Sequence, residues 1–231
     1  MKYRILSILL MLALAAPGLA ARSDGPYYCT TAGTTLYYER YAAGKNKLLQ
    51  TTTIEIESVE KSGDGRKVNY SLTLRNGNGS LMYGGRTQMS AVIDNKSDLW
   101  MDIGASVREM LKNFLKIANV SCTGDAAIVP ADMAPGDVLP DSHSVVTAAG
   151  IKFNIDVTNR SVLRRDRLTT PCGTFDCMVL REYKAEVGPG RNHCEWSENW
   201  YVRDYGYVRH DVFDKNGKLK SSEILVSRVS Q

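Results

Sequence analysis

The chain has 231 residues, of which 43% are hydrophobic and 23% are charged, and its formal net charge is +4. This length can bury one substantial core, and all-β domains of this size commonly form a single unit. The sequence lacks a basic stripe with interleaved aromatic residues, which argues against nucleic-acid binding. We therefore expect one globular domain without a nucleic-acid partner.

The first 21 residues have the composition of a signal peptide. Lys2 and Arg4 precede an uncharged apolar run over Ile5–Ala16, and the small residues Gly18 and Ala20 follow it. The run is shorter than the roughly 20 residues that a membrane-spanning helix needs. We predict export to the periplasm of a Gram-negative envelope, a mature domain over residues 22–231, and no transmembrane segment in that domain.

The cysteines indicate an oxidising compartment and disulfide bonds. Five cysteines occur, so at least one thiol has no partner within the chain. The sequence allows Cys172 with Cys177 and Cys29 with Cys122 as pairs, but it does not choose among the alternatives. A lipoprotein needs a cysteine directly after the apolar run, whereas the first cysteine is Cys29. We therefore expect a protein without a lipid anchor.

Four soft ligands lie in one stretch, namely Cys172, Cys177, His193 and Cys194. A zinc site is disfavoured because His193 and Cys194 are neighbours on a strand and point to opposite faces. If residues 186–191 form a hairpin loop, Cys177 and Cys194 lie about 20 Å apart along the strands at ~3.3 Å per residue. A disulfide tolerates only about 7 Å between Cα atoms, so this pair is disfavoured as well.

The mature chain shows strand-like runs at short spacing, separated by turn signals, which is typical of a sandwich or a curved barrel. The first four runs are Thr34–Tyr41, Leu48–Glu60, Lys67–Arg75 and Ser80–Ile93. Val59 is out of phase with the alternation in the second run, which predicts a bulge there. The Asn76–Gly79 turn is a strong hairpin signal because Asn and Gly tolerate positive φ.

The second half continues the same pattern. Ile128–Asp141 contains three prolines and is expected to be a long loop. Ile151–Val157 alternates, Asn159–Arg160 is expected to turn, Thr169–Asp214 reads as two consecutive hairpins, and Lys218–Val229 closes the domain. We predict an antiparallel β-sandwich or curved half-barrel of about eleven strands with one amphipathic helix packed against it.

That helix is predicted over Ala105–Ala118. Its apolar residues fall at helical spacing, while Arg108, Lys112 and Lys116 share the opposite side. Ser106 and Glu109 have the spacing of a capping box. A structural plug over the open end of the sheet is the favoured role, and a lid or a membrane-surface helix with a basic face is the alternative.

One aromatic ladder is the candidate ligand-binding site. Trp196, Glu198 and Trp200 alternate onto one face of a strand, so that the carboxylate lies between two indoles. Such a set can form the rim of a ligand groove in which the carboxylate orients a polar group. A core-facing strand, or an outward aromatic face beneath a loop, gives the same pattern without a ligand.

Catalytic motifs do not appear in the sequence. It contains no G-x-S-x-G, no H-E-x-x-H and no phosphate-binding glycine loop. His193 and His210 lie near the cysteines in sequence, but nothing predicts that either activates a thiol. We therefore expect a protein that is not an enzyme, with no catalytic residue, no metal and no cofactor.

Several motifs occur in a recognisable order. They are P-G-D-V-L-P-D at Pro135–Asp141, T-P-x-G-x-F-x-C at Thr170–Cys177 and W-Y-x-x-x-x-G-x-V at Trp200–Val208. Together they resemble exported envelope proteins of Bacteroidetes, either TapB-like proteins or an uncharacterised periplasmic family. The resemblance implies a periplasmic β-sandwich or half-barrel, and it implies no reaction or catalytic residues.

Two functions follow from these patterns as hypotheses. Export, many strands and one amphipathic helix favour a non-catalytic binding module for a lipophilic or envelope ligand, by analogy at the level of fold alone. The alternative is a structural or assembly partner in the cell envelope that presents an exposed apolar or aromatic patch. An enzyme of unknown type is the third hypothesis.

Overall fold

The computed structural model describes residues 25–116 and 119–230. The predicted signal peptide over residues 1–21 lies outside the described residues. The described part of the chain forms thirteen strands and one helix. In chain order these are β1 (Thr34–Ala42), β2 (Leu48–Ser62), β3 (Gly65–Asn76), β4 (Thr87–Ile93), β5 (Leu99–Met101), α1 (Ile103–Leu115), β6 (Val120–Gly124), β7 (Ala127–Val129), β8 (Ser142–Ala148), β9 (Ile151–Thr170), β10 (Gly173–Gly188), β11 (Arg191–Val202), β12 (Gly206–Phe213) and β13 (Leu219–Ser230).

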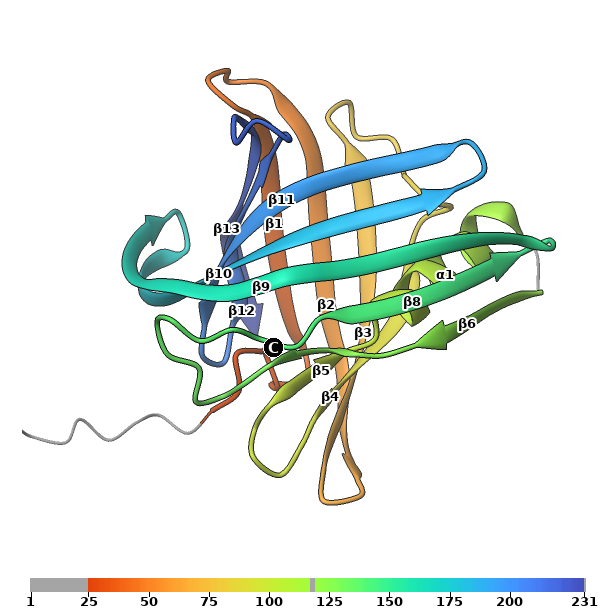
Figure 1. Cartoon of the computed structure of the whole chain (residues 1–231). Coiled ribbons are helices and arrows are strands. Elements are labelled where there is room, and N and C mark those ends of the chain that lie inside the picture. The colour runs from red at the N-terminus through yellow and green to blue at the C-terminus, as the bar shows by residue number, and fades with distance from the viewer. Residues whose placement is uncertain (1–24, 117–118, 231) are drawn as a thin grey trace, which may run out of the picture.

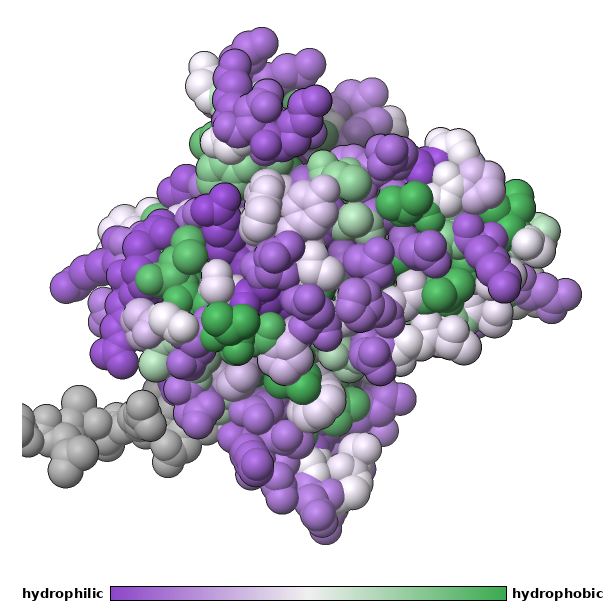
Figure 2. All heavy atoms as spheres, viewed as in Figure 1, coloured by the Kyte–Doolittle hydropathy of each residue, from purple (hydrophilic) through white to green (hydrophobic). Residues whose placement is uncertain are grey.

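All thirteen strands belong to one antiparallel sheet that does not close. Hydrogen-bonded neighbours follow the order β6-β8-β9-β10-β11-β12-β13-β1-β2-β3-β4-β5-β7, so β6 and β7 form its two edges. The sheet bends so strongly that β8–β11 cross in front of β1–β3 (Figure 1). The outward face of β8–β11 is largely hydrophilic (Figure 2). The all-β antiparallel prediction with one helix is confirmed.

The predicted number of strands was too low, and the sheet is continuous rather than split into the two sheets of a sandwich. Three of the thirteen strands are short, since β5 and β7 have three residues each and β6 has five. Such short strands give too few residues for an alternating pattern to be read. Each of them lies at or beside an edge of the sheet.

One predicted turn is a bulge. The chain does not reverse at Asn159–Arg160, because β9 continues from Ile151 to Thr170. Asn159 takes a positive φ of 52°, and the pairing with β10 shifts register between Arg181 and Tyr183. Asn tolerates this conformation as readily in a bulge as in a turn, so the dipeptide alone could not distinguish the two.

The predicted bulge in the second strand is confirmed, because the register between β2 and β3 shifts between Ile56 and Ser58. The turn at Asn76–Gly79 also forms, and the Gly79 amide donates to the Asn76 carbonyl at 2.9 Å. The returning strand begins only at Thr87, however, and not at Ser80. The intervening residues 77–86 form a loop, which lies beside the C-terminal half of α1.

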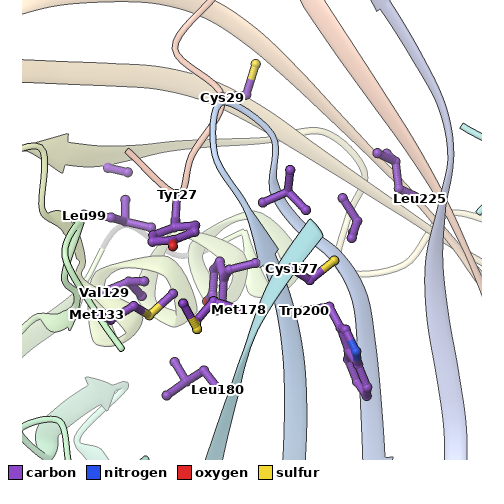
Figure 3. Packing of buried hydrophobic residues seen from close by; sticks show 14 of the residues in the cluster. Tyr27, Cys29, Leu99, Val129, Met133, Cys177, Met178, Leu180, Trp200 and Leu225 are labelled. Carbon is purple, nitrogen blue, oxygen red and sulfur yellow. The ribbon is translucent and has the colours of Figure 1, made fainter. Parts of the chain in front are cut away.

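The core lies between the two halves of the bent sheet. Leu180 on β10, Val208 on β12, Leu225 on β13 and Val68 on β3 are each completely buried. Figure 3 shows Met178, Leu180 and Trp200 of the crossing strands within the same packed cluster as Leu99 and Val129. Burial of such side chains, at about 1.5–3 kcal/mol each, is the main stabilising contribution.

Helix α1 bridges the two sides of the open sheet. It contacts β6 and β8 on one side and β4 on the other. Its residues Val107 and Leu111 pack on the cluster that contains Val146 and Ile155. Gly104 lies so close to β8 that a Cβ atom there would come within 2.7 Å of Ser144 Cβ. The helix therefore fills the gap that the strands leave.

The start of α1 differs from the predicted capping box. Asp102 is the N-cap residue, and its Oδ1 accepts a hydrogen bond from the Ala105 amide at 2.7 Å. Ser106 Oγ donates to the Asp102 carbonyl instead, and Glu109 pairs with Arg108 and Lys112. The predicted capping box is therefore wrong, because the helix begins at Ile103 and Asp102 caps it.

Replacing Asp102→Ala should therefore lower the free energy of unfolding by about 1 kcal/mol, because one helix amide loses its acceptor. Glu109→Gln is the matched control and should change the free energy by only a few tenths of a kcal/mol, since exposed ion pairs contribute little. Urea denaturation of both variants measures the difference. A larger loss for Glu109→Gln would contradict the assignment of the cap.

Candidate functional site

The end of the bent sheet where α1 lies contains an apolar pocket of about 200 Å³, which we call the mouth pocket. Four of its lining residues come from one face of α1 at helical spacing, namely Val107, Met110, Leu111 and Phe114. These are the residues whose periodicity predicted the helix. The same apolar face thus packs on β6 and β8 and lines the pocket.

The remaining apolar wall comes from distant parts of the sequence. Tyr83 in the loop 77–86 packs edge-on against Phe114, with ring centroids 6.3 Å apart. Phe153 and Ile155 approach from β9. The Phe153 ring also lies against Gly188, where a Cβ atom would come within 2.5 Å of it, so the absence of a side chain there lets the β10–β11 hairpin close over the pocket.

One side of the mouth pocket is charged. Glu186 and Arg191 line it, and Arg191 Nε donates to Glu186 Oε2 at 2.6 Å. Lys184 Nζ lies 2.8 Å from the other carboxylate oxygen. Partial burial alone would raise the pKa of Glu186, but pairing with Lys184 and Arg191 outweighs it and lowers the pKa. The pocket is therefore an apolar chamber whose one acidic group is neutralised by two cations.

A second, smaller cavity lies deeper between the halves of the sheet. Its volume is about 100 Å³, and tyrosine rings dominate its walls. Tyr38 stacks on Tyr207 with centroids 4.8 Å apart, and Tyr28 meets Tyr70 edge-on at 5.9 Å. Burial raises the pKa of Tyr38 and of Tyr207 well above the ordinary value, so both hydroxyls stay neutral. This cavity is apolar with a few hydroxyl groups.

The predicted ligand-binding ladder lies elsewhere, on β11. Trp200 is 4% exposed, and its Nε1 donates to Asp166 Oδ2 at 2.9 Å. The Arg209 guanidinium lies 4.7 Å from the centre of the Trp200 ring. The indole is thus held from β9 and β12 by a hydrogen bond and a cation–π contact.

The other two members of the ladder also have partners. Arg164 donates to Glu198 Oε2 from both terminal nitrogens at 3.3 Å, and the Arg181 guanidinium lies 4.6 Å from the Trp196 ring centre. The polar atoms and ring faces are occupied by neighbouring strands. The structure places these residues in one ladder that neighbouring side chains cover, whereas the mouth pocket offers unfilled space.

The sequence predicts the helical face of the mouth pocket but not the rest of it. Phe153 and Ile155 belonged to a run that alternates as a strand, and nothing in that run indicated which element it faces. The loop between the β10 and β11 strands was predicted over residues 186–191. The strands instead pair as far as Gly188 and Arg191, which brings Glu186 and Arg191 together beside the helix.

The predicted disulfide bonds are not found, because all five cysteines lie in the described part of the chain and are free thiols. On the β10–β11 hairpin, Cys194 lies opposite Ala185, whereas Cys177 lies one residue before the Met178–Tyr201 pair. The two thiols are therefore far apart along the hairpin. Cys172 lies in the β9–β10 turn. Burial raises the pKa of Cys177 to about 12. Among the described residues no metal-binding group of His, Cys, Asp or Glu side chains gathers.

A buried polar network continues along the inner face of β9–β12. His210 Nδ1 lies 2.6 Å from Asn199 Oδ1, and Asn199 Nδ2 donates to Glu182 at 3.3 Å. Arg160, 1% exposed, donates to the Pro140 carbonyl at 3.0 Å and to Glu182 at 3.4 Å. Burial, followed by the nearby Arg40 charge, lowers the pKa of His210 to about 4.

The chain belongs to the DUF3108-like family, whose model matches residues 31–225. A search of the curated proteins finds no match. A crystal structure from Bacteroides fragilis, described as an exported protein with a YmcC-like fold, has a TM-score of 0.71 at 19% identity, over 89% of this chain and 100% of the other. A protein from Parabacteroides distasonis, described as a lipoprotein, has a TM-score of 0.71 at 20% identity, over 89% of this chain and 99% of the other.

At these identities the two structures show a shared fold alone. They support the resemblance to exported proteins of Bacteroidetes, but they do not support the TapB-like assignment. The helix in the described residues is too short and too polar to cross a membrane.

The His210 network predicts a specific pH dependence of stability. The unfolded chain binds a proton with a pKa near ~6.5, whereas the folded chain resists protonation until about pH 4. The stability that depends on neutral His210 is therefore complete above pH ~6.5 and is lost as the pH falls toward 4. His210→Gln should reduce the fall in unfolding free energy between pH 7 and 4 by about 2–3 kcal/mol.

Urea denaturation at the two pH values gives this difference. His193→Gln is the matched control, because the His193 side chain is 41% exposed near the start of β11. An equal effect of both substitutions would show that the buried network does not cause the pH dependence.

Proposed function

We propose that this protein is a non-catalytic binding module of the bacterial envelope that takes one end of a lipophilic chain into the mouth pocket. The pocket itself carries the proposal, because seven of its nine lining residues are apolar or aromatic. Sequence evidence for a signal peptide and the exported description of the relative from B. fragilis support a location in the envelope. We propose a protein without a lipid anchor, since no cysteine follows the signal peptide directly.

The size of the pocket favours a chain end over a bulky molecule. Pockets for drug-sized ligands measure about 300–1,000 Å³, whereas the mouth pocket measures about 200 Å³. An apolar cavity of about 150 Å³ stays dry and binds a small hydrocarbon. Each methylene buried there contributes about 0.8 kcal/mol, so the pocket favours a terminal acyl segment more strongly with every methylene that it takes in.

The ion pair of Arg191 with Glu186 gives the pocket a polar side. An amphiphile could place its chain among Val107, Met110 and Phe153 while its polar group stays near Arg191, which is 52% exposed. A chemical reaction on the ligand finds no support in the thiols, because the raised pKa of Cys177 opposes formation of the nucleophilic thiolate. We therefore propose binding without catalysis.

A second candidate function, as an assembly partner in the envelope, rests on the ladder of Trp196, Glu198 and Trp200. Arg and Trp are the residue types that dominate protein interfaces, and Arg164 and Arg181 lie beside these indoles. The partners within the chain already occupy most of their contact groups. For that reason we rank this function below ligand binding.

Met110→Trp should weaken binding of a fluorescent fatty-acid probe at least tenfold, or about 1.4 kcal/mol, because the indole fills the mouth pocket. Leu163→Trp is the matched control, since Leu163 is 37% exposed on β9 and does not line the pocket. Fluorescence titration measures both affinities, and thermal melting confirms that both variants fold. No probe binding by the unaltered protein, or equal affinities of the two variants, would contradict the proposal.

A further inference from the structure

Five large hydrophobic side chains lie on the elements that border the mouth pocket and are exposed to solvent. They come from the loop 77–86, from the end of α1 and from the start of β9. They are Leu81 (54% exposed), Tyr83 (41%), Phe114 (57%), Leu115 (44%) and Ile151 (44%), and we call this set the mouth rim.

These residues lie together although they are far apart in sequence. Tyr83 and Phe114 line the pocket and touch each other. Leu115 adjoins Phe114, and Ile151 lies on the same face of β9 as the pocket residues Phe153 and Ile155. In Figure 1 the tips of β8–β11 and helix α1 meet at one end of the molecule, and Figure 2 shows hydrophobic side chains gathered there. Exposed apolar groups of this kind mark an interaction surface.

The surroundings of the mouth rim are positively charged. Lys116 and Lys152 are exposed, and no ion pair in the described ranges involves either of them. Arg191 and Lys184 stand beside the pocket and share one carboxylate, that of Glu186. Among these groups four cations therefore face one acidic side chain.

We propose that the mouth rim docks on an anionic lipid surface. Its apolar side chains would enter the interfacial region, and the surrounding lysines would attract acidic headgroups by about 1 kcal/mol each. A second copy of the chain is a poor occupant, because two positively charged mouths would repel each other. This inference extends the proposed function, since docking places the opening of the pocket against lipid, but vesicle binding itself needs no ligand in the pocket.

The test is co-sedimentation of the purified mature chain with phosphatidylcholine vesicles that contain or lack phosphatidylglycerol. Binding is expected to the anionic vesicles only and to weaken as salt screens the lysines. The double variant Phe114→Ser with Leu115→Ser should reduce binding at least tenfold, and so should Lys116→Glu with Lys152→Glu. Val138→Ser is the matched control, because Val138 is 81% exposed outside the mouth rim.

Three results would overturn the inference: no binding to anionic vesicles, equal binding to neutral ones, or unchanged binding by both double variants. Sedimentation velocity without vesicles tests whether the mouth rim binds a second copy of the chain. A dimer that the rim substitutions dissociate would also overturn the inference. Met110→Trp separates the two proposals, since it fills the pocket and leaves the rim intact. Loss of probe binding with retained vesicle binding is the expected result for that variant.

Discussion

The open sheet is the constraint on which the other features of this protein depend. Thirteen strands pair in one continuous ladder, and the strands at its two ends leave a gap that no further strand fills in the described residues. Helix α1 bridges the gap, because its apolar face can pack on β6 and β8 while its other flank reaches β4. An α-helix satisfies its own backbone hydrogen bonds, so it closes such a gap without needing strand partners. The close approach of Gly104 to Ser144 shows how tightly the entry of the helix is fixed.

The gap also explains why the mouth pocket differs from the cavity among the tyrosine rings. Between the halves of the sheet, opposed strands bring tyrosine rings together and leave only about 100 Å³. Under the helix, α1 meets the strand hairpins along one face, and the round surface of a helix cannot fill the angle between them. The unfilled angle is the mouth pocket. Its position at an end of the sheet leaves Phe114 and Leu115 exposed, so the binding pocket and the proposed lipid-docking rim have one structural origin.

Some buried polar side chains form ion pairs and hydrogen bonds with one another inside the fold. Glu223 is 3% exposed and accepts from Thr52 at 2.6 Å and from Arg40 at 3.0 Å. Such a buried pair is weak evidence of stabilisation, because desolvation offsets much of the attraction. Glu223 on β13 thus joins partners on β1 and β2, and loss of Arg40 would leave the buried carboxylate without its cation. Together with His210 on β12, the pair favours one strand register and carries a pH dependence into the interior.

The sequence by itself determined the strand-rich fold, the amphipathic helix and most hairpins, because hydrophobic period and turn chemistry are local. It placed Val107 and Phe114 on one helical face and Trp196 and Trp200 on one strand face correctly. Only the tertiary structure decided that the first pair lines an open pocket while the second is covered by arginines from neighbouring strands. The reason is that burial and free space depend on which distant elements meet, and pairing across a sheet of thirteen strands is not encoded within any one of them.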